Sequence, residues 1–430
     1  MSPSFIGLAM MQFLTVFNDN AYRWLIIPIG YEVLGPRYEG LILSIGLACF
    51  VVPYVLLAGP AGYVADRFPK RTVMATCMVA QALILVFGMG AILITSIPLA
   101  FLILVLMGTQ GAMLAPAKGG CIPEIVRADR ISMANGVVGF AMILGSVVGS
   151  VLGNELYVLT RPAGLHHWGL SAGVLIGAAC AGWIAALTTV RSPAADPRRR
   201  FRVNQVRETL RDLAQLAADR KLLVVALASA FFWFLAALSQ INVYLFGTTE
   251  LHIHQQYVGP LLGVLALGAG MGSVLAGIWS AGRIDLGIVP LSALGIAASA
   301  GLLWAIPGFS GAPAAAYAWT CFGLWLLGLA AGLYDVPLQA FMQHNSPLAK
   351  RGAILAAANF LAFTAMLLAS AVFWILRDVF ARSGAQIFLF GAIVTLPVLG
   401  GLLGRFPREA LAALVRPIRA AARLRRPRSG

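Results

Sequence analysis

The chain has 430 residues, of which 60% are hydrophobic and only 11% are charged. A water-soluble domain carries about twice that share of charged residues, so the composition excludes an ordinary soluble protein. The formal net charge of +15 by itself is compatible with nucleic-acid binding, and the placement of the basic residues decides that question.

Twelve apolar stretches follow one another along the chain, each long enough as a helix to cross a hydrocarbon core of about 30 Å. They are rich in Leu, Ala, Gly and Phe without strict alternation, which argues against a β-barrel and leaves helices to satisfy the backbone in lipid. We therefore predict an all-α membrane protein with twelve transmembrane helices in two six-helix bundles. The predicted spans are residues 5–31, 41–64, 72–94, 98–117, 132–157, 170–190, 222–246, 258–280, 286–306, 314–342, 353–376 and 387–404.

The first stretch is predicted to be a retained span rather than a signal peptide. Polar residues from Asn18 to Asn20 interrupt it, and no cleavage site follows a short charged start. The five cysteines form no CxxC pair, which predicts neither a disulfide framework nor a zinc site. The histidines between spans lack further ligands, so we expect no metal and no cofactor.

The basic residues fall mainly on one side of the predicted membrane. With the N-terminus in the cytoplasm, 26 of the 31 Lys and Arg lie in cytoplasmic segments. This positive-inside pattern predicts a multi-pass protein of the cytoplasmic (inner) membrane with both termini in the cytoplasm. Topology and contact with membrane phospholipids thus explain the positive charge, and we expect no nucleic-acid partner.

The longest polar segment, residues 191–221, leaves six predicted spans on either side. Its apolar residues recur at helical spacing, which predicts an amphipathic helix on the cytoplasmic face. The sequence therefore predicts four parts: an N-terminal six-helix bundle (1–190), a cytoplasmic linker (191–221), a C-terminal six-helix bundle (222–404) and a basic cytoplasmic tail (405–430).

The two halves share local features. GTQGAMLAP (108–116) precedes Asn135 in the next span, and GLAAGLYDVP (328–337) precedes Asn359 in the next span. Two similar six-helix halves are typical of transporters built from parallel repeats, whose substrate site lies between the halves near mid-membrane. A stripe of Gly145, Gly149 and Gly153 predicts a tight helix crossing rather than ligand contact.

The segment GYVADRFPKR (62–71) lies between the second and third predicted spans and resembles the signature loop of the major facilitator superfamily. Pro69 replaces the usual glycine. The resemblance implies the major facilitator fold and a secondary transporter that works by alternating access. It also implies a gate: Gly62 for close helix approach, Asp66 facing a helix N-terminus, and the basic residues holding the loop inside. The matching residues are Gly62, Asp66, Arg67, Lys70 and Arg71.

Three short motifs are similar to the bacterial lysophospholipid transporter branch of that superfamily. They are FNDN (17–20), PAKGGCIPEI (116–125) with AlaAsnGly at 134–136, and VPLQ (336–339) with a following Asn359. The resemblance implies inward flipping of lysophospholipids for reacylation, and hence a lysophospholipid acyltransferase as a partner. It places Asp19 in the substrate cavity, and it places Lys118 and Glu124 on a second pattern of less defined role.

The chain departs from that branch at two positions. Family members can carry a basic residue where this sequence has Gln240, and Asp335 stands where an apolar residue is expected. Either change is compatible with another headgroup or another substrate.

Charged residues inside a span are costly in lipid and usually functional. Asp19 and Arg23 lie four residues apart and share one helix face, so they can pair as a self-neutralising structural pair. Alternatively, Arg23 replaces the basic residue missing at Gln240 and binds a phosphate while Asp19 meets an amine. Both hypotheses remain open, and the full set of substrate-binding candidates is Asn18, Asp19, Asn20, Arg23, Gln240, Asn135 and Asn359, with Lys118, Glu124 and Asp335 as further polar candidates.

Three other functions compete with lysophospholipid flipping. The same fold can act as a permease or exporter for a water-soluble metabolite or drug. A membrane-bound lipid enzyme is disfavoured because no HxxxxD, GxSxG or HExxH pattern occurs, and we expect no enzymatic activity. A scaffold without transport is disfavoured by the polar cluster in the first span and by the intact gate loop.

Overall fold

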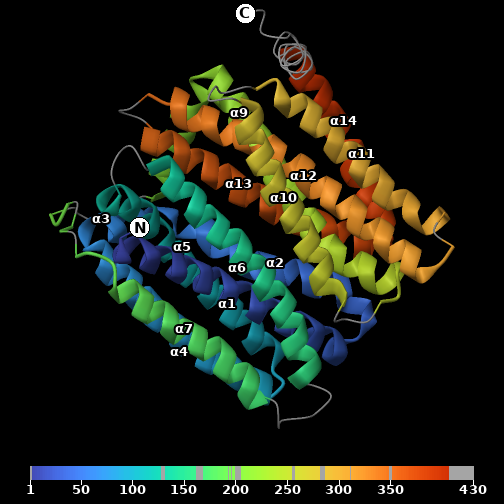
Figure 1. Ribbon diagram of the computed structural model, residues 1–430, viewed down its shortest axis with the longest axis horizontal. Helices are drawn as coiled ribbons and strands as arrows, with labels where there is room; N and C mark the ends of the chain where they lie inside the picture. The colour runs from blue at the N-terminus through green and yellow to red at the C-terminus, as the bar shows by residue number, and fades with distance from the viewer. Residues whose placement is uncertain are drawn as a thin grey trace, which may run out of the picture. The chain divides into compact units, whose positions relative to one another are not determined.

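The computed structural model describes residues 2–126, 131–160, 168–191, 193–194, 196–198, 205–253, 257–280, 286–309, 311–347 and 351–405. Within these ranges the chain forms helices and no strand (Figure 1). The helices are α1 Pro3–Leu34, α2 Glu39–Leu56, α3 Ala58–Arg67, α4 Lys70–Leu93, α5 Ile97–Ile125, α6 Ile131–Thr160, α7 Trp168–Leu187, α8 Gln205–Ala217, α9 Arg220–Leu245, α10 Val258–Ser280, α11 Ile288–Phe309, α12 Pro313–Asn345, α13 Arg351–Trp374 and α14 Gly384–Arg405; the short segments η1 Pro36–Tyr38, η4 Phe246–Glu250 and η7 Ile375–Val379 adjoin them.

The predicted all-α membrane fold is confirmed. Among the described residues, 11 helices are long and apolar enough to cross a membrane. The remaining predicted span is α1, which at 32 residues is long enough to cross. The polar residues around Asp19 lower its average hydropathy, so length and composition alone do not identify it.

The predicted span 41–64 is two helices rather than one. α2 ends at Leu56, and α3 begins at Ala58. Pro60 supplies the physical reason, because it has no N–H to donate to the Leu56 carbonyl and its ring clashes with that carbonyl. Because of this break, residues 62–67 of the gate loop lie on the separate short helix α3.

The described chain groups into two compact units. The first comprises Met1–Ala214, His252–Gly263 and Phe363–Arg382, and the second comprises Gln215–Leu251, Val264–Ala362 and Ser383–Gly430. Both units thus take segments from the second half of the sequence. The four-part division at residues 190, 221 and 404 stays a prediction.

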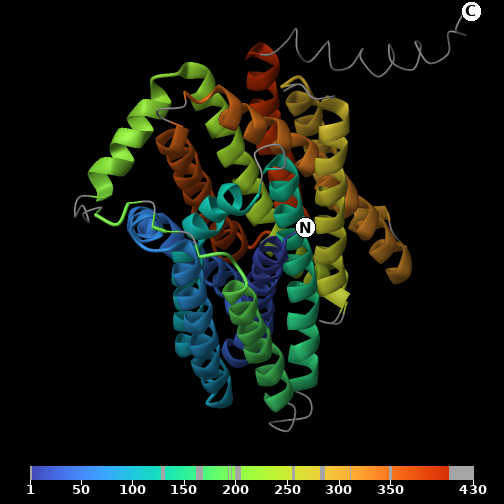
Figure 2. The same cartoon turned by 60° about the vertical axis from the view of Figure 1, so that its left-hand side comes forward.

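In the first unit α1 packs against α6 and α7, and α4 runs beside α7 (Figures 1 and 2). The glycine stripe of α6 explains the closeness to α1. A Cβ at Gly145, Gly149 or Gly153 would collide with the carbonyl oxygens of α1 at Phe13, Phe17 and Ala21, respectively. The predicted packing role of this stripe is therefore confirmed.

In the second unit α11 packs between α12 and α14, and α9 contacts both of these neighbours. Glycines let α10 and α12 approach to backbone contact: Gly328 and Gly332 lie against the carbonyls of Leu265 and Ala269. Gly111, which the repeat aligns with Gly332, likewise has no room for a Cβ beside Tyr54 of α2. Each half therefore uses a glycine on its fourth span for close packing.

Candidate functional site

Three helices of the first unit bring polar side chains to one point. Asp19 of α1 is 7% exposed, and its Oδ1 accepts a hydrogen bond of 3.2 Å from Gln81 Nε2 of α4. Lys118 of α5 acts electrostatically on Asp19, more strongly than Arg23 does. We call Asp19, Gln81 and Lys118 the Asp19 cluster. A buried carboxylate in a spanning helix thus has an amide donor, and Lys118 is the cation with the strongest electrostatic effect on it.

Arg23 does not pair with Asp19 within 4 Å in the described structure. Its NH2 group donates to Asn20 Oδ1 at 3.2 Å, and its guanidinium lies 5.5 Å from the Trp24 ring centroid. Asn20 Nδ2 in turn donates to the Val16 carbonyl at 2.9 Å. The four-residue spacing brought the two charges to one face, but the arginine side chain turns to neighbours on α1 instead. The cation that acts most strongly on Asp19 is Lys118.

Tyr54 of α2 forms an aromatic wall next to the Asp19 cluster. Asp19 acts electrostatically on its hydroxyl. The Tyr54 ring stacks on Phe363 of α13 with centroids 4.8 Å apart, and it lies 5.7 Å from Phe50. The charged groups are therefore bordered by flat apolar surfaces that suit the first carbons of an amphiphile.

Further buried amides lie on α1 and α5, two of the helices that contribute to the Asp19 cluster. Gln12 and Asn18 of α1 are fully buried, and Gln110 of α5 is nearly so, yet their side chains have no hydrogen-bond partner among the described residues. Gln81 Oε1 is also unpartnered. Buried polar groups without partners cost free energy, so groups that a ligand or water can satisfy are expected here.

Sequence reasoning missed Gln12, Gln81 and Tyr54 as site residues. The two glutamines were detectable, because each is an isolated polar residue inside an apolar stretch and such residues default to function. Tyr54 carried no signal, since an aromatic residue in a span is usually packing.

The close helix approach expected at Gly62 of the gate loop is not seen in the described structure and stays a prediction. A Cβ at Gly62 would meet no atom within 4 Å, so close helix approach does not require this glycine in the structure. The carbonyl oxygen of Asp66 accepts from the Asp196 backbone N–H at 2.9 Å, which ties the loop to the linker. Arg67 lies 5.8 Å from the Tyr63 ring, and Arg71 is partly buried. That Asp66 faces a helix N-terminus stays a prediction.

Lys70 joins the two sequence motifs that were identified separately. Its ammonium forms an ion pair with Glu124 near the end of α5, although Lys70 itself is 8% exposed. A Cβ at Gly120 would lie 2.7 Å from Lys70 Cε. The motif 116–125 therefore provides both the partner carboxylate and the space for the lysine of the gate loop.

The second unit contains a smaller polar group, which we call the Asp335 cluster: Asp335, Gln339 and Ser229. Gln339 Nε2 donates to Asp335 Oδ1 at 3.4 Å and to Ser229 Oγ at 3.5 Å. Gln240 of α9 is partly buried, and Asn359 of α13 is exposed. Asn135 belongs to α6, but its side chain lies outside the described part of the structure.

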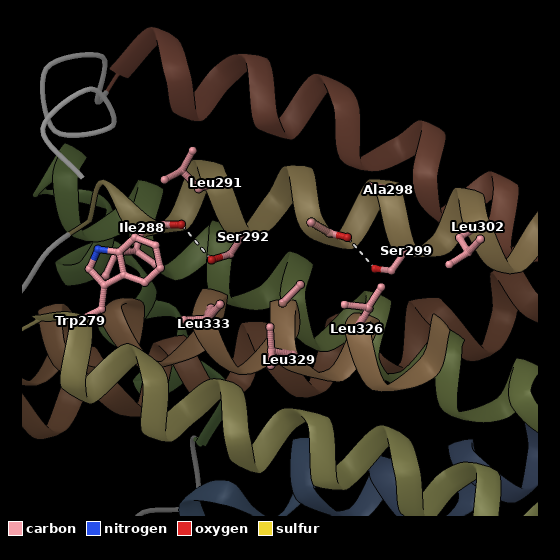
Figure 3. Close-up of a pocket in the computed structure, with 12 residues that line it drawn as sticks. Trp279, Ile288, Leu291, Ser292, Ala298, Ser299, Leu302, Leu326, Leu329 and Leu333 are labelled. Atoms are coloured by element: carbon pink, nitrogen blue, oxygen red, sulfur yellow. Dashed lines mark hydrogen bonds between the residues drawn. The ribbon is translucent and has the colours of Figure 1, made fainter. Parts of the chain in front are cut away.

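A groove of about 510 Å³ between α11 and α12 is the other concavity of note (Figure 3). Leucines from both helices line it, including Leu291, Leu326 and Leu329. The hydroxyls of Ser292 and Ser299 donate to carbonyls of their own helix, at 2.8 and 2.5 Å. The described residues that line this groove carry no charge, so it is not the candidate site for a charged headgroup.

Opposite charges buried on several spanning helices define an integral membrane protein with an internal polar site, the usual arrangement of a transporter. The family model described as Major Facilitator Superfamily matches residues 8–371. The chain therefore belongs to the Major Facilitator Superfamily, a family of transporters rather than enzymes.

Two relatives are named lysophospholipid transporter LplT. The protein from Serratia proteamaculans is 32% identical over 202 residues, which cover 46% of each chain. The one from Cronobacter sakazakii is 34% identical over 155 residues, covering 36% of this chain and 37% of the relative. The matched stretches thus span less than half the length of these relatives. The resemblance to this branch is confirmed.

A solved structure has the same fold. It is a bacterial homolog of the human lysosomal transporter Spinster, captured inward-facing and unoccupied. The TM-score is 0.63 at 15% identity, with 95% of this chain and 96% of that chain covered. The similarity supports the predicted major facilitator fold.

Proposed function

We propose that the protein is a secondary transporter that moves lysophospholipids across the cytoplasmic membrane by alternating access. The observation that carries the proposal is the Asp19 cluster, a buried carboxylate with a lysine acting on it from another helix. The names of the LplT relatives point to the same substrate class.

The charges of the cluster suit a zwitterionic headgroup. Asp19 meets a headgroup amine, and Lys118 meets the phosphate. With substrate bound, each of these two side chains would face a group of opposite charge. This arrangement would offset the several kcal/mol that Asp19 or Lys118 costs as a stranded charge in the membrane.

The aromatic wall and the apolar span surfaces account for the tail. Tyr54 and Phe363 border the charges on one side. A one-tailed lipid needs charged contacts for its head and apolar contacts for its single chain, and this site offers both. A water-soluble metabolite or drug, the second candidate function, needs only the charged contacts.

The two candidates are separated by a matched pair of substrates. Proteoliposomes should take up radiolabelled lysophosphatidylethanolamine, and glycerophosphoethanolamine, which has the same headgroup and no acyl chain, should not compete at equal concentration. Full competition by the tail-less compound, with no lipid uptake, would assign the protein to water-soluble solutes.

We propose the topology and the partner from the same premise. The protein lies in the cytoplasmic (inner) membrane, with both termini and the linker 191–221 in the cytoplasm. The proposed partner is a lysophospholipid acyltransferase, which consumes the delivered substrate. Cysteine at Ser429 should react with an impermeant maleimide only after cells are opened. Reaction in intact cells would reverse the orientation.

The loop 62–71 is proposed as the gate. Asp66→Asn should slow exchange several-fold while substrate affinity stays unchanged, because a charge near a helix terminus shifts a two-state balance by on the order of 1 kcal/mol. Loss of affinity at a normal exchange rate would make Asp66 a substrate ligand instead.

A further inference from the structure

The groove between α11 and α12 opens on a part of the second unit that hydrocarbon surrounds. α10, α11 and α12, which supply its lining, are all long and apolar enough to cross a membrane. The leucines of its walls, including Leu291, Leu302 and Leu329, are partly exposed in the described structure. The medium that reaches such a surface in a bilayer is lipid, because the hydrocarbon core holds no water.

Small residues at helical spacing form the floor of the groove. Gly295, Ala298 and Ser299 lie on one face of α11 and line it. A Cβ at Gly295 would lie 3.1 Å from the Cβ of Ala330 on α12, so the two helices approach closely at this point. Larger side chains on this face would fill the space between the leucine walls, so the groove exists because these residues are small.

The polar groups of the groove need no ligand. Ser292 and Ser299 are 4% and 3% exposed, and each hydroxyl donates to a carbonyl of α11. Hydroxyls that are already hydrogen-bonded can lie against hydrocarbon without a large cost. The lining therefore favours an apolar chain.

The dimensions of the groove match one such chain. Its lining on α11 runs from Ile288 to Leu302, a length of about 21 Å at 1.5 Å per residue. The volume of about 510 Å³, spread over that length, gives a channel about 5–6 Å wide. An extended acyl chain is about 5 Å wide, because nonbonded carbons touch at about 3.5–4.0 Å. A helix with its side chains is about 10–12 Å across and does not enter such a channel.

The two ends of the groove give the chain a direction. Trp279, near the end of α10 and 37% exposed, lies at one end of the groove, and Leu302 lies at the other (Figure 3). Tryptophan is enriched at the level of the lipid headgroups. One leaflet with its headgroup region is about 20–22 Å deep, which equals the length of the groove. A chain that starts beside Trp279 therefore ends near mid-membrane, and under the topology proposed above it belongs to the cytoplasmic leaflet.

We propose that this groove is a second lipid site, which holds one acyl chain of a diacyl membrane phospholipid. It shares no residue with the Asp19 cluster and does not depend on which substrate is transported. A groove without charged contacts cannot select a scarce lipid by its headgroup, so mass action fills it with the abundant phospholipids of the leaflet. The bound chain supplies the contacts that α11 and α12 lack along the groove and thereby stabilises the second unit.

A binding experiment tests the site with a defined lipid. Delipidated protein in detergent is titrated with dioleoylphosphatidylethanolamine, and native mass spectrometry counts the bound molecules. Ala298→Trp fills the groove and should weaken the tightest binding about tenfold or more, because several buried methylenes lose their contacts. Ala298→Leu, a smaller plug, should weaken it less. The control Leu294→Trp changes an exposed residue of α11 outside the lining and should bind like the parent.

Equal affinity in the parent and in both Ala298 variants would overturn the site. Lysophosphatidylethanolamine is the competing occupant. If it binds the parent more tightly than the diacyl lipid does, and Ala298→Trp abolishes that binding, the groove belongs to the transported class of lipid and the proposal is wrong.

Melting in detergent tests whether the bound chain stabilises the protein. Saturating dioleoylphosphatidylethanolamine should raise the melting temperature of the parent and of Leu294→Trp by about 3 °C or more. Ala298→Trp should respond by less than half as much, because its indole already occupies the groove. An equal rise in Ala298→Trp would refute the site. Dimers of the parent that Ala298→Trp dissociates would assign the groove to a second copy of the chain and would refute it too.

Discussion

The two halves of the chain carry similar motifs but place different chemistry on them. The residue offset that aligns Pro116 with Pro337 also aligns Lys118 with Gln339 and Asp19 with Gln240. Where the first half has a carboxylate and an ammonium, the second half has two amides. The repeat has kept a packing glycine on the fourth span of each half, Gly111 and Gly332, and has changed the charges.

The carboxylate of the second half lies elsewhere and has different neighbours. Asp335 is on the fourth span of its half rather than the first, and Gln339 and Ser229 accompany it. In the described part of the chain it forms no ion pair. Under the proposed function, the comparison predicts that the first half recognises charge and the second half contributes hydrogen bonds.

The largest expected effect comes from removing either charge of the first half. Asp19→Asn and Lys118→Gln should each lower lysophospholipid uptake by about 100-fold, because each removes a proposed charged contact to the headgroup, worth about 1.5–3 kcal/mol. The matched control is Glu155→Gln, an acid on α6 that should retain near-normal uptake. Normal uptake by either single variant would remove the charged pair from the site.

The double variant Asp19→Asn with Lys118→Gln sharpens the same contrast. Thermal stability should return to the parent value, since no charge remains unpaired, while uptake stays absent. Melting in detergent and uptake in proteoliposomes measure the two effects separately. Recovery of uptake together with stability would show that the pair only neutralises itself.

The next largest effect is the loss of stability expected when a packing glycine is replaced. Gly149→Ala should destabilise the protein by about 1–3 kcal/mol, because the new Cβ collides with the Phe17 carbonyl of α1. Gly173→Ala on α7, which has open space, should change stability by less than about 0.5 kcal/mol. Thermal unfolding monitored by circular dichroism compares them, and equal melting temperatures would contradict the α1–α6 contact.

A smaller effect is expected at the amide that replaces Lys118 in the second half. Gln339→Ala removes two long hydrogen bonds of about 1 kcal/mol in total and should reduce uptake only about fivefold. A loss as large as that of Lys118→Gln would show that both halves recognise the substrate equally.

The smallest effect is expected at the gate glycine. Gly62→Ala should change the free energy of unfolding by less than about 0.5 kcal/mol, since no atom lies near the added methyl. The melting temperature and the rate of uptake should therefore stay the same. A large loss of uptake with unchanged melting would mean that Gly62 packs closely in another conformation of the cycle.

Helices and family were predictable from the sequence because apolar length, charge bias and a signature loop are local properties. The break at Leu56 was also in the sequence, in Pro60, but hydropathy averaged over it. The neighbours of Asp19 were not predictable from spacing, since Arg23 is near in sequence whereas Gln81 and Lys118 come near only through the packing of α4 and α5. The Lys70–Glu124 ion pair was not predictable for the same reason, because the two residues are far apart in sequence and meet only through tertiary packing.

The glycine stripe of α6 also bears on how the protein is made. α1 is the least apolar of the long helices, so its insertion is weakly favoured when it leaves the ribosome. The surface that receives it is α6, which is synthesised only after four further helices. During biogenesis of the first unit, α1 therefore cannot pack against α6 until the four helices between them and α6 itself have been synthesised. Nascent chains halted before α6 should leave α1 open to alkali extraction, and chains halted after it should not.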